Sequence, residues 1–311
     1  MSDARNHHFI PKAYLRGFAQ DRPGKKEPQV WVTDLVRSRS FSTSIRNIAA
    51  RRDFNRIEVE EHPPNALEEA YGGFESLIRP SIKRIVKSGA FLDKDRLVVL
   101  NLIAILSVRS PGKRRIISEF IGDISKKMLQ ITLGTQGRYE SIMKDINQAD
   151  GLTSPSNSVS YDEMKKFVES DEYDVNVDQT YLIGLELSSI DVVLRTLLSR
   201  KWRLLLAERK SGEFITSDDP ACLKNTKELP SDFMGPGHGM SDTVLLFPLS
   251  RKAALIGSFE GEEGTIDCSP NLIGAFNSDV ISNAREQIYS YDNKFRYYKH
   301  PNLYPGSNII E

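Results

Sequence analysis

The feature that most constrains the fold is a change in hydrophobic period close to residue 200. Between about 65 and 199, apolar residues recur at three- and four-residue intervals, which is typical of amphipathic helices. From Lys201 onward, short runs such as KWRLLLAE and TVLLFPLS are separated by turn residues, which is typical of strands. Near the N-terminus QVWVTDL has the same character, and RSFSTS is its candidate hairpin partner. Strands, then helices, then strands predict an α+β fold rather than alternating βαβ units.

We expect the N-terminal and C-terminal strands to form an antiparallel sheet that packs against the central helical section. A chain of 311 residues is long enough to bury such a core in a single domain over residues 1–311. The Gly/Ser/Pro composition of GLTSPSNSVS, and the acidic sequence after it, predict a loop or an insertion near 150–178. No glycine-rich phosphate loop is visible. The predicted strand segments are 29–35, 201–208, 213–216, 244–248 and 252–258.

Composition limits the cell compartment and the class of partner. The net charge of zero argues against attraction of the whole molecule to nucleic acid or to a membrane, but it leaves a local basic face open. Cys222 and Cys268 have no Cys or His near them at zinc-ligand spacing, so we interpret them as buried thiols in a reducing compartment. The longest apolar run, 97–108, is shorter than the roughly 20 residues of a membrane span. We expect a cytoplasmic protein without a membrane segment; the oligomeric state is not predictable.

The N-terminal sequence HHFIPKAYLRGF concentrates residues that carry either chemistry or packing. Pro11 is suited to the first turn of a helix, and Tyr14, Leu15 and Phe18 follow at helical spacing, so we expect them to be buried. Chain termini are normally the least constrained part of a domain, which makes this concentration unusual. An imidazole near neutral pH serves as general base, general acid or metal ligand, so His8 is a candidate catalytic residue.

This opening resembles the family catalogued as domain of unknown function 4238, whose members begin with His-His-x-x-Pro-x-x-Tyr-Leu. The matching residues here are His7, His8, Pro11, Tyr14 and Leu15. The resemblance implies a bacterial-type protein, often associated with defence or mobile elements, and it implies no established activity. Further similar blocks are Asn47-Ile48-Ala49, Arg52-Asp53-Phe54, Leu67-Glu68 with Glu75, Arg109-Ser110-Pro111, Trp202, Thr216-Ser217-Asp218-Asp219-Pro220 (with Asp219 in place of the family's Asn), Pro248-Leu249-Ser250 and Asn277.

Glu75 and Asp218 are the carboxylates that we predict to act with His8. Asp218 ends a strand-type run at a proline-bounded turn, which projects its side chain from the edge of a sheet. Glu75 follows Glu68 by seven residues, two helical turns, so both lie on one face of their helix. A His, one or two Asp and a Glu are together adequate for metal-assisted hydrolysis of a phosphodiester. A divalent metal fits this set, but the sequence identifies none.

A phosphodiester substrate needs cations to hold its phosphates, so nucleic acid is the candidate partner. Arg51, Arg109 and Asn277, which lie in or beside the blocks similar to the family, are the predicted substrate contacts. The wider basic set comprises Arg37, Arg39, Arg46, Arg51, Arg52, Arg56, Lys113, Arg114 and Arg115.

Each of these residues also has a structural interpretation. His8 can pin the N-terminal segment by a hydrogen bond, Asp218 can form an Asx turn, and Glu75 can serve as a partner for a nearby Arg. Arg-rich stretches are often no more than solvated surface. Two hypotheses therefore stand: a nuclease-like hydrolase of phosphodiester bonds in bacterial defence, and a non-catalytic binding or regulatory protein with a structural His motif. A nucleotide transferase is a third, which the missing phosphate loop disfavours.

Overall fold

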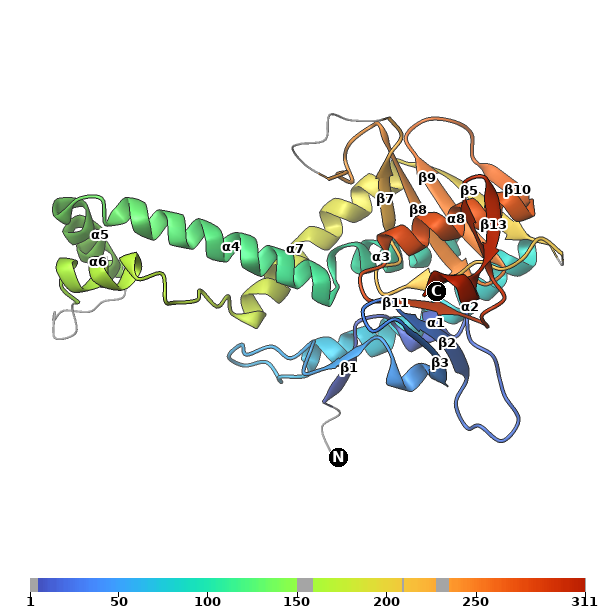
Figure 1. Cartoon of the computed structure of the whole chain (residues 1–311), viewed down its shortest axis with the longest axis horizontal. Coiled ribbons are helices and arrows are strands. Elements are labelled where there is room, and N and C mark those ends of the chain that lie inside the picture. Colours follow the sequence, from blue (N-terminus) through green and yellow to red (C-terminus); the bar gives the residue numbers. More distant parts are fainter. Residues whose placement is uncertain (1–4, 150–158, 209, 228–234, 311) are drawn as a thin grey trace. The chain divides into compact units, whose positions relative to one another are not determined.

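The structure is a computed structural model that describes residues 5–149, 159–208, 210–227 and 235–310 (Figure 1). Residues 150–158, which fall in the predicted loop or insertion, lie outside the described residues. The chain forms two compact units. The larger unit combines Met1–Pro111 with Ile183–Glu311, and the smaller unit is Gly112–Leu182.

The smaller unit is helical in its described part. It packs the side chains of Leu133, Tyr139 and Val168 into a small core of its own. Helix α6 begins at a capping box, in which Ser160 and Glu163 satisfy each other's backbone N–H groups. The helices of this region are α4 Pro111–Thr132, α5 Gln136–Ala149, α6 Tyr161–Glu169 and α7 Gln179–Leu198; α4 and α7 cross the unit boundaries.

The larger unit contains a five-stranded sheet in the order β10-β5-β9-β8-β7. All neighbouring strands are antiparallel except β10 and β5, which are parallel. Consecutive apolar residues of one strand enter different cores, as Leu204 and Leu205 of β5 do, because side chains alternate between the faces of a sheet. The strands are β5 Lys201–Ala207, β7 Cys222–Asn225, β8 Thr243–Ser250, β9 Ala253–Ser258 and β10 Gly264–Cys268.

Helices cover both faces of this sheet. On the face of Leu204, the core includes side chains of α2 Ala66–Ser88 and α3 Asp93–Val108. On the face of Leu205, it includes side chains of α8 Pro270–Asn283. Because both faces of the sheet are covered, the strand-type runs after residue 200 are almost continuously apolar and do not alternate between apolar and polar residues.

A second, four-stranded antiparallel sheet joins the two ends of the chain in the order β3-β2-β11-β6 (Figure 1). This sheet and the helical section confirm the predicted α+β class. The expectation that all five segments share one sheet is wrong, because 29–35 and Thr216 lie here while the other segments lie in the five-stranded sheet. The strands are β2 Gln29–Asp34, β3 Arg39–Ser44, β6 Thr216–Ser217 and β11 Gln287–Ser290; two-stranded ribbons pair β1 Asn6–His8 with β4 Ala50–Arg52 and β12 Arg296–Lys299 with β13 Asn302–Pro305.

The N-terminal segment docks on both sheets through Tyr14 of the short helix α1, Lys12–Leu15. The Tyr14 hydroxyl donates to the carbonyl oxygen of Pro248 at 2.7 Å and lies 2.8 Å from Thr216 Oγ1, which supplies the second hydrogen bond. The ring packs 5.4 Å, centroid to centroid, from both Phe18 and Phe247. The predicted burial of Tyr14 and Phe18 is confirmed, since both side chains have no exposed surface.

Helix α2 carries the site described below. Its buried side is formed by Ile78, Ile82 and Ile85, at the three- and four-residue spacing of a helix that packs on one face. The helix ends at Gly89, whose φ of 67° is the left-handed conformation that glycine adopts most readily. No helix among the described residues is long and apolar enough to cross a membrane.

Replacing Tyr14 with Phe tests how strongly the N-terminal segment is held. Tyr14→Phe keeps the ring but leaves Thr216 Oγ1 and the Pro248 carbonyl without their buried partner. We expect the free energy of unfolding, measured by urea denaturation, to fall by about 1–3 kcal/mol. Tyr304→Phe is the control, because the Tyr304 hydroxyl makes no hydrogen bond within the described residues, and it should change stability by less than about 0.5 kcal/mol. Equal effects of the two changes would contradict the docking role.

Candidate functional site

The two adjacent histidines lie on β1, which pairs with β4. His7 is fully buried, and its Nδ1 accepts the backbone N–H of Asn55 at 2.9 Å. His8 is 8% exposed, and its carbonyl oxygen accepts from Arg109 Nη2 at 2.5 Å. The Nε2 atom of His8 is buried without a hydrogen-bond partner among the described residues. Burial lowers the pKa of His8, and so does the nearby charge of Lys12.

Arg109 anchors β1 to helix α2. Its guanidinium lies 4.0 Å from the ring centroid of Tyr71, in the geometry of a cation–π contact. A second link runs from Asn55, whose side-chain amide donates to the Glu68 carboxylate of α2. Arg109 is only 3% exposed. The Arg-Ser-Pro block of the sequence therefore supplies a buried cation that fastens the N-terminal strand.

Glu75 is the predicted catalytic residue that reaches a cavity. The cavity has a volume of about 430 Å³, and Glu75 lines it together with Lys12, Arg16 and Arg79. Burial raises the pKa of Glu75; the charges of Lys12 and Arg109 act in the opposite direction, as does the backbone N–H of Ala13. A carboxyl group whose pKa is raised toward neutrality, and which faces a cavity, is suited to proton transfer.

His8, Glu75 and Arg109 belong to one cluster of interacting charges. The charges of Lys12 and Glu68 act on the pKa of both His8 and Glu75, and Arg109 acts on that of Glu75. These side chains come from β1, α1, α2 and the residue after α3, which are separated in the chain. The structure thus brings together three of the predicted site residues, of which only Glu75 lines the cavity.

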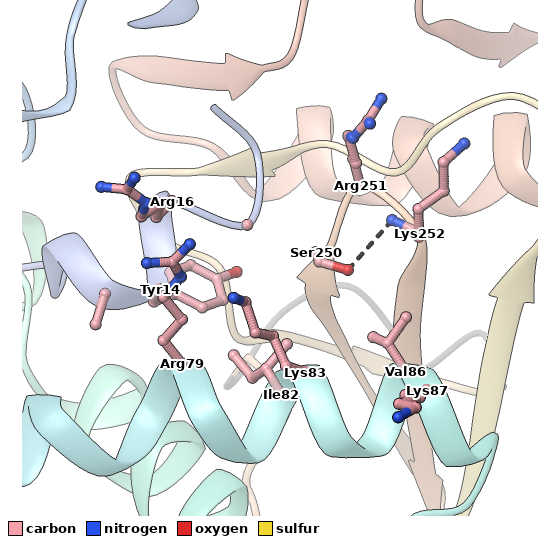
Figure 2. Close-up of a pocket in the computed structure, with 12 residues that line it drawn as sticks. Tyr14, Arg16, Arg79, Ile82, Lys83, Val86, Lys87, Ser250, Arg251 and Lys252 are labelled. Atoms are coloured by element: carbon pink, nitrogen blue, oxygen red, sulfur yellow. Dashed lines mark hydrogen bonds between the residues drawn. The ribbon is translucent and has the colours of Figure 1, made fainter. Parts of the chain in front are cut away.

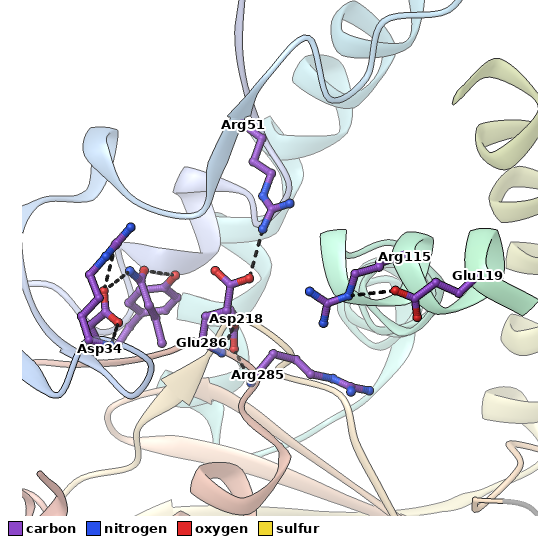
Figure 3. A network of polar contacts seen from close by, with 10 residues as sticks. Asp34, Arg51, Arg115, Glu119, Asp218, Arg285 and Glu286 are labelled. Carbon is purple, nitrogen blue, oxygen red and sulfur yellow. Dashed lines mark hydrogen bonds and ion pairs between the residues drawn. The ribbon is translucent and has the colours of Figure 1, made fainter. Parts of the chain in front are cut away.

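Asp218 occupies a different environment (Figure 3). Its carboxylate accepts the backbone N–H groups of Arg285 at 2.9 Å and Glu286 at 2.8 Å, and so fixes the chain between α8 and β11. Burial raises its pKa to about 6, against these hydrogen bonds. None of the hydrogen bonds of Asp218 within the described residues involves His8 or Glu75. The Thr216 turn still meets the N-terminal motif, through Tyr14.

The predicted substrate contacts Arg51 and Asn277 are held by other protein groups. Arg51 pairs with the Glu286 carboxylate at 3.1 Å (Figure 3). Asn277 has no exposed surface; its amide donates to the carbonyls of Glu213 and Arg296 and accepts the N–H of Ile215. We therefore leave both out of the proposed site. Much of the wider basic set is paired in the same way: Arg37 with Asp34, Arg52 with Asp53, Arg56 with Glu58 and Arg115 with Glu119.

The sequence did not identify a metal ion, and the described residues form no cluster of metal ligands. No group of three or more His, Cys, Asp or Glu side chains in this part of the chain is arranged to hold a metal ion.

Cations that our sequence prediction missed line a second cavity of about 310 Å³ (Figure 2). Arg79, Lys83 and Lys87 of α2 lie along it, and Arg251 and Lys252 come from the turn between β8 and β9. The four-residue spacing of the α2 cations is visible in the sequence and predicts that they share one helix face.

Comparison with known proteins supports the resemblance predicted from the N-terminal motif. A family model described as "Protein of unknown function (DUF4238)" matches residues 6–294. No curated protein and no solved structure matches the chain.

Removing the Asp218 carboxylate tests its structural role. Asp218→Ala leaves two backbone N–H groups without an acceptor, so we expect the free energy of unfolding at pH 5 to fall by about 1–3 kcal/mol. The folded-state pKa of about 6 lies above the ordinary value of 3.8, so the wild type loses stability as the pH rises between these values. The loss caused by Asp218→Ala should therefore be smaller at pH 8.

Urea denaturation at both pH values measures this difference. Asp292→Ala, which removes a carboxylate from an exposed hydrogen bond, is the control and should show no comparable pH dependence. A loss for Asp218→Ala that grows between pH 5 and pH 8 would contradict the assignment.

Proposed function

We propose that this chain, which belongs to the DUF4238 family of proteins of unknown function, is a hydrolase that acts on phosphodiester bonds. One observation carries the proposal: Glu75 lines a cavity of about 430 Å³ beside Lys12, Arg16 and Arg79. Cations in a concave site attract a phosphate, and a carboxyl group beside them is in a position to exchange a proton with it.

The residues of this cavity match the steps of hydrolysis. Water attacks phosphorus, the bond to the leaving oxygen breaks, a proton leaves the water and a proton reaches the leaving oxygen. Glu75 is the residue to which we assign proton transfer, because burial raises its pKa and it faces the cavity. Lys12, Arg16 and Arg79 stabilise the negative charge that develops on the phosphoryl oxygens.

His8 and Arg109 act in this proposal as positioning residues. The buried Nε2 of His8 does not line the cavity, whereas the hydrogen bond from Arg109 to the His8 carbonyl holds β1 in place. Lys12 follows β1 after only three residues, so this bond also restrains the cation beside Glu75. Asp218 contributes to stability and not to the reaction.

A second candidate is a non-catalytic binding or regulatory protein. The observation in its favour is that the motif residues serve the fold: His7 and Asp218 accept backbone N–H groups, and Tyr14 joins two sheets. In this case the same cavity binds a phosphate-bearing ligand without cleaving it.

The setting that we propose is the bacterial cytoplasm, where a nuclease-like effector would serve in defence. The family resemblance supports this role. Cys222 and Cys268 are free and buried, as expected of structural thiols in a reducing compartment, and burial raises the pKa of both.

Glu75→Gln tests the catalytic proposal. The amide keeps the shape of the side chain but does not transfer a proton, so we expect cleavage to fall by about 10²–10⁴-fold. Fluorescently labelled DNA and RNA, single-stranded and duplex, are incubated with the protein in EDTA and separately with Mg²⁺, and products are resolved by gel electrophoresis. Glu69→Gln, an exposed carboxylate of the same helix that lines neither cavity, is the control and should retain full activity.

The melting temperature of both variants should stay close to that of the wild type. Equal cleavage by wild type and Glu75→Gln would remove Glu75 from the mechanism. Absence of cleavage of every substrate by the wild type would favour the non-catalytic candidate.

A further inference from the structure

The second cavity of the larger unit is lined by many cationic side chains. Six of its twelve lining residues are cationic and none is acidic: Arg16, Arg79, Lys83, Lys87, Arg251 and Lys252. Ala13, Ile82 and Val86 give it an apolar floor between α1 and α2. Figure 2 shows the α2 cations along one side of this floor and Ser250, Arg251 and Lys252 across from them.

Carboxylates of the described residues do not pair with the three α2 cations that line this cavity. Arg79, Lys83 and Lys87 are exposed and form no ion pair among the described residues, whereas their helix neighbour Arg84 binds Asp95 at 2.6 Å. Across the cavity, Arg251 and Lys252 share the single carboxylate of Glu213, at 2.6 and 3.3 Å. The cavity therefore keeps an excess of positive charge although the chain has a net charge of zero.

The α2 cations form a regular row that begins at Glu75. Glu75, Arg79, Lys83 and Lys87 follow one another at intervals of four residues, so they lie on one side of the helix about 6 Å apart along its axis. Arg16 and Arg79 line both cavities, which makes the two cavities adjoining parts of one groove. A ligand with evenly spaced negative charges fits this row better than a single anion does.

We infer that this groove binds a single strand of nucleic acid, with successive phosphates along Arg79, Lys83 and Lys87 and the strand running toward Glu75. The cavity, at about 310 Å³, has room for a few groups of one strand at a time. Its side-chain donors are charged groups suited to phosphates, so we expect little preference for base sequence. The direction of the strand toward Glu75 rests on the proposed function, whereas binding to the groove is tested without reference to cleavage.

Binding is measured by fluorescence anisotropy, with a labelled twelve-nucleotide oligothymidine in EDTA. Glu75→Gln should bind at least as tightly as the wild type, because it removes a carboxylate that lies in the path of the strand. Lys83→Glu should weaken binding by at least about tenfold, because it places a like charge beside the phosphates. Lys299→Glu makes the same change in net charge at an exposed residue that lines neither cavity, and it should change the affinity by less than about twofold.

The salt dependence gives a second readout. The logarithm of the binding constant falls with the logarithm of the salt concentration, and each phosphate contact to a single strand contributes about 0.7 to the steepness of this fall. Lys83→Ala should therefore make the slope shallower by about 0.7, and the double variant Lys83→Ala/Lys87→Ala by about twice as much. Thermal melting shows whether each variant is folded. If Lys83→Glu does not fold, the salt dependence of Lys83→Ala and Lys83→Ala/Lys87→Ala decides the test. A duplex of the same length should compete at least tenfold more weakly than the single strand.

Equal binding by Lys83→Glu and Lys299→Glu would overturn the inference, as would equal competition by duplex or by vesicles of anionic lipid. Binding that depends on Lys83, without cleavage by the wild type, would support the groove while rejecting the hydrolase. Cleavage that depends on Glu75, with single-strand binding unaffected by Lys83→Glu, would support the hydrolase while rejecting the groove.

Discussion

The hydroxyl group of Tyr14 makes the contact on which the candidate site depends. It bonds to the Pro248 carbonyl and to Thr216, and so fixes the four-residue helix α1 against strands of both sheets. A helix this short has little stability of its own, and only tertiary packing holds it. Because α1 and the residue after it carry Lys12, Ala13 and Arg16, this docking forms one wall of both cavities. In the proposed function, the family's N-terminal motif therefore contributes by positioning α1, although His7 and His8 are buried.

Several buried polar groups of the N-terminal segment have hydrogen-bond or cation–π partners. Arg109 binds the His8 carbonyl and stacks on Tyr71, and Asn55 binds both His7 and Glu68. Burying such groups without partners would destabilise the fold by several kcal/mol in total, so each is useful only with the others in place. The same cluster sets the electrostatic surroundings of Glu75.

Local sequence patterns predicted the helical section between about 65 and 199 and the β2–β3 hairpin, because periodicity and turn residues are short-range signals. They did not predict the β1–β4 ribbon or the parallel β10, whose partners are distant in sequence. The same limit applies to the site. Asp218 looked available from the sequence, but its carboxylate accepts the backbone N–H groups of Arg285 and Glu286, 67 and 68 residues away. The clustered arginines near residue 50 suggested a basic face, but carboxylates pair with Arg51 and Arg52. The α2 cations form no ion pair among the described residues, and the sequence showed them only as basic residues four positions apart.

The charges around Glu75 also indicate which form of this carboxyl group a bound substrate would meet. Burial and the charge of Glu68 raise the pKa of Glu75, while the charges of Lys12 and Arg109 lower it. A phosphate bound between Lys12, Arg16 and Arg79 adds negative charge beside Glu75 and neutralises part of the cations' effect. Both changes favour the protonated carboxyl group, since a nearby like charge disfavours the ionised form. In the proposed reaction, substrate binding would therefore favour the protonated form of Glu75, which then acts as the general acid that protonates the leaving oxygen. The negative charge of the bound strand would thus help to set the protonation state that the reaction needs.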